Sequence, residues 1–110
     1  MTRKTENEQI LPENRLKETL RMNGLDYKLI ERNDRAAIYE TYINGRLCGF
    51  EVIRIQIKHN PLREALPSND DFGLEGSRCY FAGEPLRARR YFKFLTKKLT
   101  SIEQSDKSKH

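Results

Sequence analysis

The residues with the clearest chemical potential are cations in the last quarter of the chain. Residues 86–110 contain eight basic and two acidic side chains, although the net charge of all 110 residues is only +5. Several cations along one helix can neutralise the phosphates of a nucleic acid and release its counterions. This pattern predicts nucleic-acid binding through five side chains, which are Arg87, Arg89, Arg90, Lys93 and Lys97. The alternative is that these charges only solvate the outer face of a helix.

A second group combines aromatic and basic side chains near the middle of the chain. Side chains alternate between the two faces of a strand, and the expected strand register places four residues on one face: Tyr39, Phe50, Arg35 and Arg54. Exposed aromatic rings among cations can stack nucleic-acid bases on an open sheet. The alternative is that the first helix of the chain covers this face, because large apolar side chains are usually buried.

Acidic residues offer two weaker arrangements. In the same register Glu40 and Glu51 fall on an otherwise apolar face, where two carboxyl groups could share a proton and act as acid and base. A β-bulge near Gly49 would instead turn Glu51 outward. The other arrangement is an acidic loop that contains Asp70, Asp71 and Glu75. Its spacing lacks the alternating oxygen ligands of a calcium loop, so a role in turns is the simpler interpretation.

Nucleophilic catalysis has equally little support. Cys48 or Cys79 with His59 as a base would match no known signature of a cysteine nucleophile. The two cysteines also lack metal-ligand spacing and form no disulfide framework. We therefore expect a non-enzymatic binding or accessory protein with no metal and no cofactor.

Three strands joined by two tight turns are expected to position these residues, at 27–32, 35–43 and 47–58. Asn33-Asp34 and Asn44-Gly45 are typical of two-residue hairpin turns, because these residue types tolerate a positive φ. Such turns would place Ile38 opposite both Leu29 and Glu51. In this register the apolar core face includes three isoleucines, Ile53, Ile55 and Ile57.

Helices are expected on either side of the strands. Leu16 and Leu20 lie four residues apart and Gly24 follows as a left-handed cap, which predicts a helix over 13–22. Gly83-Glu84-Pro85 is typical of a helix start. An apolar stripe follows it at helical spacing: Ala88, Phe92, Leu95, Leu99 and Ile102. The long connection before this helix is expected to hold a helical turn at 68–72 and a short strand at 78–81.

These elements together predict a two-layer α+β domain. It consists of an antiparallel meander of three strands, or four if 78–81 joins it, with a helix before and a helix after. The domain is expected to span 10–103, between disordered tails at 1–9 and 104–110, and the second helix is expected to pack on the isoleucine face. The order of helix, three strands and helix resembles the double-stranded-RNA-binding domain. That resemblance implies phosphate contacts from the start of the second helix.

The stretch from Leu25 to Gly73 also resembles small uncharacterised bacterial proteins of the kind found on phages and other mobile elements. The resemblance rests on the segments LDYKLIERNDRAAIYE, GFEVIRIQI and PSNDDFG, followed by a C-terminal helix. It departs after Gly73, where EGSRCYF stands in place of an apolar and aromatic run. The resemblance implies a similar fold and no particular activity.

Partners and compartment follow from charge and hydropathy. The sequence has no apolar run of membrane-spanning length and no signal-peptide pattern, which predicts a soluble, cytoplasmic protein without a membrane partner. The expected partner is nucleic acid. The alternative is a protein–protein interaction module, either a homodimer or a complex with another protein. Such a module would dock through the mixed sheet face or the edge of the third strand.

Overall fold

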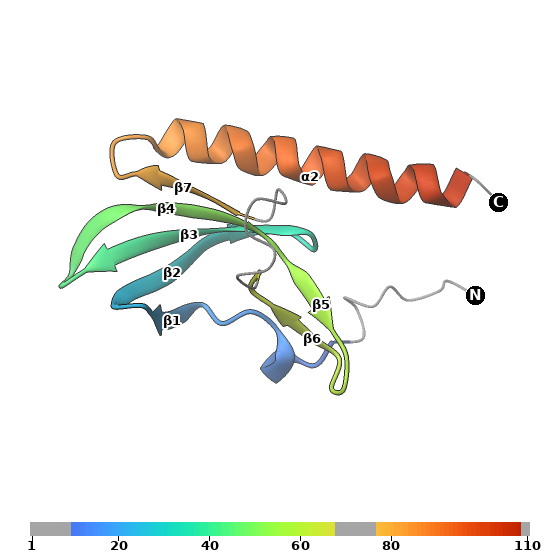
Figure 1. The fold of residues 1–110 in the computed structure, drawn as a ribbon, viewed down its shortest axis with the longest axis horizontal. Coiled ribbons are helices and arrows are strands. Elements are labelled where there is room, and N and C mark those ends of the chain that lie inside the picture. Colours follow the sequence, from blue (N-terminus) through green and yellow to red (C-terminus); the bar gives the residue numbers. More distant parts are fainter. Residues whose placement is uncertain (1–9, 68–76, 109–110) are drawn as a thin grey trace.

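A five-stranded antiparallel sheet with one long helix forms the body of the protein (Figure 1). The computed structural model describes residues 10–67 and 77–108. The elements in chain order are the 3-10 turn η1 (Pro12–Asn14), β1 (Thr19–Met22), β2 (Leu25–Arg32), β3 (Ala36–Ile43), β4 (Arg46–Arg54), β5 (Gln56–Lys58), β6 (Arg63–Ala65), β7 (Ser77–Phe81) and α2 (Pro85–Ser108). The sheet order is β1-β2-β3-β4-β7, and β5 pairs with β6 in a separate hairpin. The predicted α+β class is therefore confirmed.

The helix predicted before the strands is wrong, because that segment contains β1. Leu20 and Met22 are half-buried while Thr19 and Arg21 are exposed, which is the period of two expected for a strand. Asn23 and Gly24 have φ values of 53° and 79° and form a hairpin turn rather than a helix cap. The resemblance in element order to the double-stranded-RNA-binding domain is lost with that helix.

The turn at Asn44-Gly45 is a hairpin as predicted, but a β-bulge follows it. Thr41 pairs with Gly49 and Tyr42 pairs with Leu47, so Cys48 is an extra residue on β4. The bulge moves Ile38 opposite Val52 instead of Glu51. A shift of one residue exchanges the two faces of a strand, so the predicted register and both predicted faces are wrong.

The preceding turn also differs by one residue from the prediction. The Asn33 amide donates to the Ala36 carbonyl, which makes Asp34-Arg35 the two-residue loop. The Asn33 side-chain oxygen accepts bonds from the amides of Arg35 and Ala36, at 2.8 and 2.9 Å. This turn and a second bulge at Ile30 place Leu29 opposite Tyr39, and Ile38 opposite Glu31.

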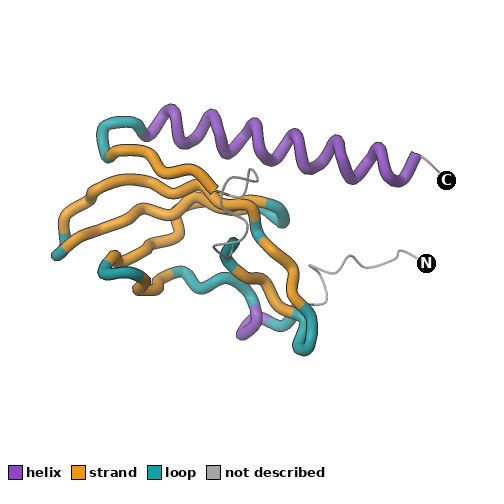
Figure 2. Tube along the Cα trace, in the orientation of Figure 1, coloured by secondary structure: helices purple, strands orange, loops and turns teal. Residues whose placement is uncertain are grey.

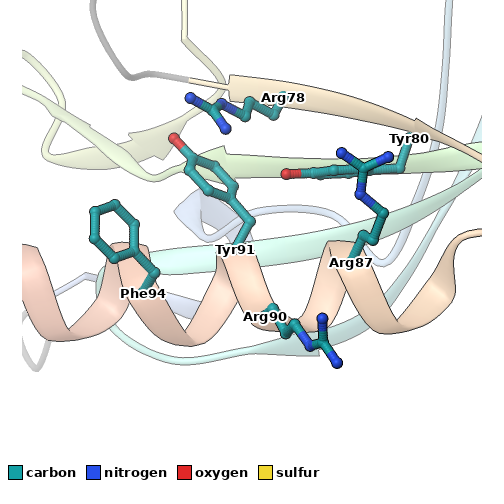
Figure 3. Close-up of a pocket in the computed structure, with 6 residues that line it drawn as sticks. All are labelled: Arg78, Tyr80, Arg87, Arg90, Tyr91 and Phe94. Carbon is teal, nitrogen blue, oxygen red and sulfur yellow. The ribbon is translucent and has the colours of Figure 1, made fainter.

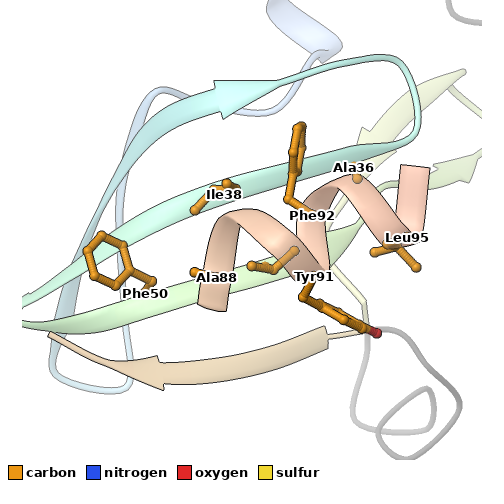
Figure 4. Packing of buried hydrophobic residues seen from close by; sticks show 8 residues of the cluster. Ala36, Ile38, Phe50, Ala88, Tyr91, Phe92 and Leu95 are labelled. Atoms are coloured by element: carbon orange, nitrogen blue, oxygen red, sulfur yellow. The ribbon is translucent and has the colours of Figure 1, made fainter. Parts of the chain in front are cut away.

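We call the sheet surface under α2 the helix face (Figure 2). Its cluster consists of Ala36, Ile38, Phe50 and Val52 from the strands, with Ala88, Tyr91, Phe92 and Leu95 from α2 (Figure 4). The predicted stripe is confirmed at Ala88, Phe92 and Leu95, and Leu99 packs beside them. The prediction that the helix covers the isoleucine face is wrong, because Ile53 and Ile55 lie on the other side.

We call that opposite surface the hairpin face, with Tyr27, Ala37, Tyr39, Ile53 and Ile55 buried on it. The β5–β6 hairpin and the segment around η1 cover this face (Figure 1). A buried ion pair joins the cover to the sheet: Arg32 donates two bonds to Glu64, at 2.7 and 2.6 Å. The amide of Leu16 adds a third, at 2.9 Å. The Tyr39 hydroxyl donates to the Lys17 carbonyl at 2.8 Å.

The strand predicted at 78–81 is present as β7 and pairs with β4. A side chain at Gly49 would place its Cβ 2.3 Å from the Tyr80 carbonyl oxygen, so this close pairing requires glycine. The third predicted strand, which is β4, therefore lies between β3 and β7, so the predicted docking edge is not free. The helical turn predicted at 68–72 and the tail at 1–9 lie outside the described residues. The helix α2 continues to Ser108, past residue 103, where the domain was expected to end.

Candidate functional site

An open groove of about 490 Å³ lies between β7 and α2, at one margin of the helix face (Figure 3). Its lining consists of three arginines and three aromatic residues: Arg78, Tyr80, Arg87, Arg90, Tyr91 and Phe94. We call it the cation–aromatic groove. Residues 78 and 80 share one side of β7, and helix positions three or four residues apart share one side of α2. The pairing of β7 with β4 brings the two sets together.

Three aromatic rings form a continuous series along the groove. The Tyr80 and Tyr91 ring centroids are 6.4 Å apart, and those of Tyr91 and Phe94 are 6.1 Å apart. Tyr91 is only 8% exposed, whereas Phe94 is 58% exposed. Phe94 lies beside the apolar stripe of α2, and much of its ring is in solvent.

Cations accompany each of the three rings. The Arg78 guanidinium lies 4.6 Å from the Tyr91 centroid, and Arg87 lies 6.0 Å from the Tyr80 centroid. The Lys98 ammonium lies 6.0 Å from the Phe94 centroid. These distances are within the range of cation–π attraction. The arginines are therefore held against the rings while their exposed guanidinium groups still face solvent.

The groove lining carries no acidic side chain within the part of the chain that is described. Glu84, just before α2, forms an ion pair with Arg87 at one end of the groove. Among the described residues, 10–67 and 77–108, no carboxylate forms an ion pair with Arg78 or Arg90. The local charge of the groove is therefore positive, which favours an anionic ligand.

The five cations predicted from α2 do not form one patch. Arg87 and Arg90 line the groove. Arg89 lies on another side of the helix and forms an ion pair with Glu31 of β2. Lys93 and Lys97 are exposed on α2. Sequence reasoning missed Arg78 and Tyr80, although their alternation with Cys79 in a strand next to a basic helix was the available signal.

The aromatic surface predicted on the sheet is not formed. Tyr39 and Phe50 are 1% and 7% exposed and belong to the hairpin face and the helix face respectively. The Cys48 bulge separates them, because it reverses the side on which β4 residues point relative to β3. Arg54 is exposed and Arg35 is half-buried, and neither lines the groove. Both rings are thus buried, Phe50 under α2 and Tyr39 under the β5–β6 hairpin and the segment around η1.

A smaller cavity of about 240 Å³ opens on the hairpin face, beside Glu51, Tyr27 and Cys79. Burial raises the pKa of Glu51, and a hydrogen bond from Tyr27 partly offsets this. Burial, and then the nearby Glu51, raise the pKa of the Cys79 thiol, which is the opposite of what a nucleophile needs.

The predicted pairing of Glu40 with Glu51 is also not formed. Glu40 pairs across the sheet with Phe50 of the helix face, whereas Glu51 pairs with Tyr39 of the hairpin face. The Tyr42 hydroxyl donates to Glu40 at 2.8 Å. The Cys48 thiol donates to the Thr41 carbonyl at 3.3 Å. Each of these groups thus has a local structural partner.

Within residues 10–67 and 77–108, no three histidine, cysteine, aspartate or glutamate side chains gather closely enough to hold a metal ion. The single long helix among these residues, α2, is too polar to cross a membrane.

No protein-family model, no curated protein and no solved structure matches this chain. The resemblance to phage and mobile-element proteins therefore stays a prediction.

Proposed function

We propose that the protein binds nucleic acid through the cation–aromatic groove and the adjoining side of α2. The observation that supports this proposal is convergence: Arg78 from β7 and Arg87 and Arg90 from α2 line the same groove as one series of rings. Arginine suits phosphate because its planar guanidinium can donate two parallel bonds to it. Aromatic rings held among such cations are the usual means of contacting bases.

Salt dependence is the quantitative signature of this function. Each phosphate contact lowers the slope of log K against log salt by about 0.7 on single strands and about 0.9 on duplex DNA. Arg78 and Arg90 form no ion pair with a carboxylate of the described residues, and their loss should therefore reduce the slope by about 1.4 to 1.8 in magnitude. A variant with lost packing but intact charge would not change the slope.

Fluorescence anisotropy with labelled 20-nucleotide single strands and duplexes, between about 20 and 200 mM salt, tests the proposal. The variant Arg78→Gln/Arg90→Gln is compared with Arg46→Gln/Lys58→Gln, which removes the same charge from exposed positions outside the groove. We expect weaker binding and a shallower slope for the first variant only. Equal losses in both variants would assign the affinity to net charge, and no binding at low salt would contradict the proposal.

A protein–protein module is the second candidate, and one observation favours it. The strand β7 is an edge of the sheet, and Phe81 at its end is 79% exposed. A strand edge with an exposed aromatic residue is a suitable template for strand addition by another chain. Sedimentation equilibrium at several concentrations separates the candidates, because a homodimer through β7 would shift to monomer when Phe81→Ser is introduced.

A further inference from the structure

We infer that the cation–aromatic groove selects single-stranded over duplex nucleic acid, with an unpaired base stacked on Phe94. This inference rests on the proposed function and goes beyond it by assigning the strand class and the contacting ring. It follows from which of the three rings is accessible, from the length of the cation series, and from where the bases of each ligand lie.

Phe94 is the ring that a ligand can reach most easily. Tyr91 is 8% exposed and Arg78 covers its face at 4.6 Å. Tyr80 is half-buried, with Arg87 at 6.0 Å. Phe94 has Lys98 at the same distance of 6.0 Å, but it is 58% exposed, and it lies beside Tyr91 (Figure 3). The exposed part of the Phe94 ring is apolar surface that a stacked base would remove from water.

The cations beside Phe94 extend along α2 in both directions. Arg87 and Arg90 precede it, and Lys97 and Lys98 follow it. The eleven steps from Arg87 to Lys98 rise about 16 Å along the helix, at 1.5 Å per residue. Phosphates in one strand of duplex DNA are about 3.4 Å apart along its axis, and an unstacked single strand is more extended, so this series spans at most about five nucleotides. A single strand along α2 would therefore place an interior nucleotide at Phe94.

A duplex cannot use the same ring. Its bases are paired and stacked inside the helix, so the duplex presents mainly phosphates and sugars to the protein. Phe94 would face the sugar–phosphate backbone and gain no stacking, whereas an unpaired base gains this contact whatever its identity. The cations can contact the phosphates of both ligands, but the exposed ring can stack only with an unpaired base of the single strand.

The chain offers an unusually clean reporter for this contact, because it contains no tryptophan. In Phe94→Trp the indole is the sole tryptophan, and base stacking should quench its fluorescence. Titration with oligothymidines of three, five and ten nucleotides should show quenching that saturates, with affinity rising steeply up to about five nucleotides. The same titration with a ten-base-pair duplex should leave the emission nearly unchanged.

Phe94→Leu is the matched loss-of-function variant, since it keeps an apolar side chain and removes the aromatic face. We expect it to weaken binding of ten-nucleotide single strands by about 5- to 150-fold, which is the range measured for one stacked base. Duplex affinity and thermal stability should stay the same. Phe94→Tyr should restore single-strand binding, because its ring is equally able to stack.

The outcomes separate the two proposals. If the wild-type protein binds neither single strand nor duplex at low salt, the proposed function itself fails. If it binds both and Phe94→Leu weakens them equally or not at all, nucleic-acid binding stands and the strand selectivity is wrong. Preference of the wild-type protein for duplex over single strand would also overturn the inference.

Discussion

The two faces of the sheet are covered in physically different ways. On the helix face, one helix buries a stripe of apolar residues whose spacing repeats every three or four positions. On the hairpin face, a short hairpin and an irregular segment are joined to the sheet by polar groups, notably Arg32 and Glu64. The first cover depends on local periodicity, and the second on bonds between residues as far as 48 positions apart. We therefore expect the pH dependence of stability to come from the polar groups of the hairpin face. Changes in apolar packing should affect stability on both faces.

The largest predicted effect comes from Glu64, whose side chain is fully buried. Glu64→Gln leaves Arg32 without its carboxylate and should lower the free energy of unfolding by about 3–5 kcal/mol at neutral pH. Burial raises the pKa of Glu64, but bonds from Arg32 and Leu16 outweigh it, so the pKa is lowered. The carboxylate thus stabilises the fold above its unfolded pKa, and this contribution is lost as pH falls through the lower folded pKa. Urea unfolding at several pH values measures both effects.

Glu31→Gln is the matched control for Glu64→Gln. Glu31 pairs with Arg89 across the helix face, but both side chains are about half exposed, at 43% and 49%. Solvent screens such a pair, so its loss should cost only about 0.2–1 kcal/mol. If Glu64→Gln costs no more than this control, the ion pair does not hold the hairpin cover in place.

This contrast between covers also explains what could be predicted from sequence. The stripe on α2 and the Asn44-Gly45 turn were predictable because each depends on neighbouring residues alone. Asn23-Gly24 has the same two residues, yet it was interpreted as a helix cap, since Leu16 and Leu20 fit a helix as well as a strand. Only pairing with β2 decides between them, and that pairing is not local.

One bulged residue accounts for most of the error in the predicted faces. Cys48 adds a residue to β4, and every β4 side chain beyond it changes sides relative to β3. The predicted surfaces at Tyr39 and Phe50 failed for this reason. Arg87 and Arg90 were predictable as charges on a helix, whereas Arg78 became recognisable only when β7 was placed beside α2.

An intermediate effect is expected when the same group is deleted on each face. Ile38 lies on the helix face and Ile53 on the hairpin face, at 0% and 1% exposure. Ile38→Val and Ile53→Val each remove one methylene, and each should cost about 0.5–1.5 kcal/mol. Equal costs would show that the hairpin cover packs as densely as the helix. A cost near zero at Ile53 alone would show that it does not.

The smallest predicted effect concerns Glu51, another acidic residue of the hairpin face, and its sign is opposite to that of Glu64. Burial raises the pKa of Glu51, and the bond from Tyr27 only partly lowers it. The carboxyl group therefore binds a proton more tightly in the folded state than in the unfolded state. Its contribution to stability is fully present below the unfolded pKa, and it is lost as pH rises through the folded pKa. Glu51→Gln should therefore leave the free energy of unfolding at pH 7 unchanged or slightly higher, whereas Glu64→Gln should lower it. Urea unfolding of both variants under identical conditions measures the difference. A clear loss at pH 7 would mean that Glu51 acts as an ionised anchor like Glu64, and the hairpin face would then hold two such anchors instead of one.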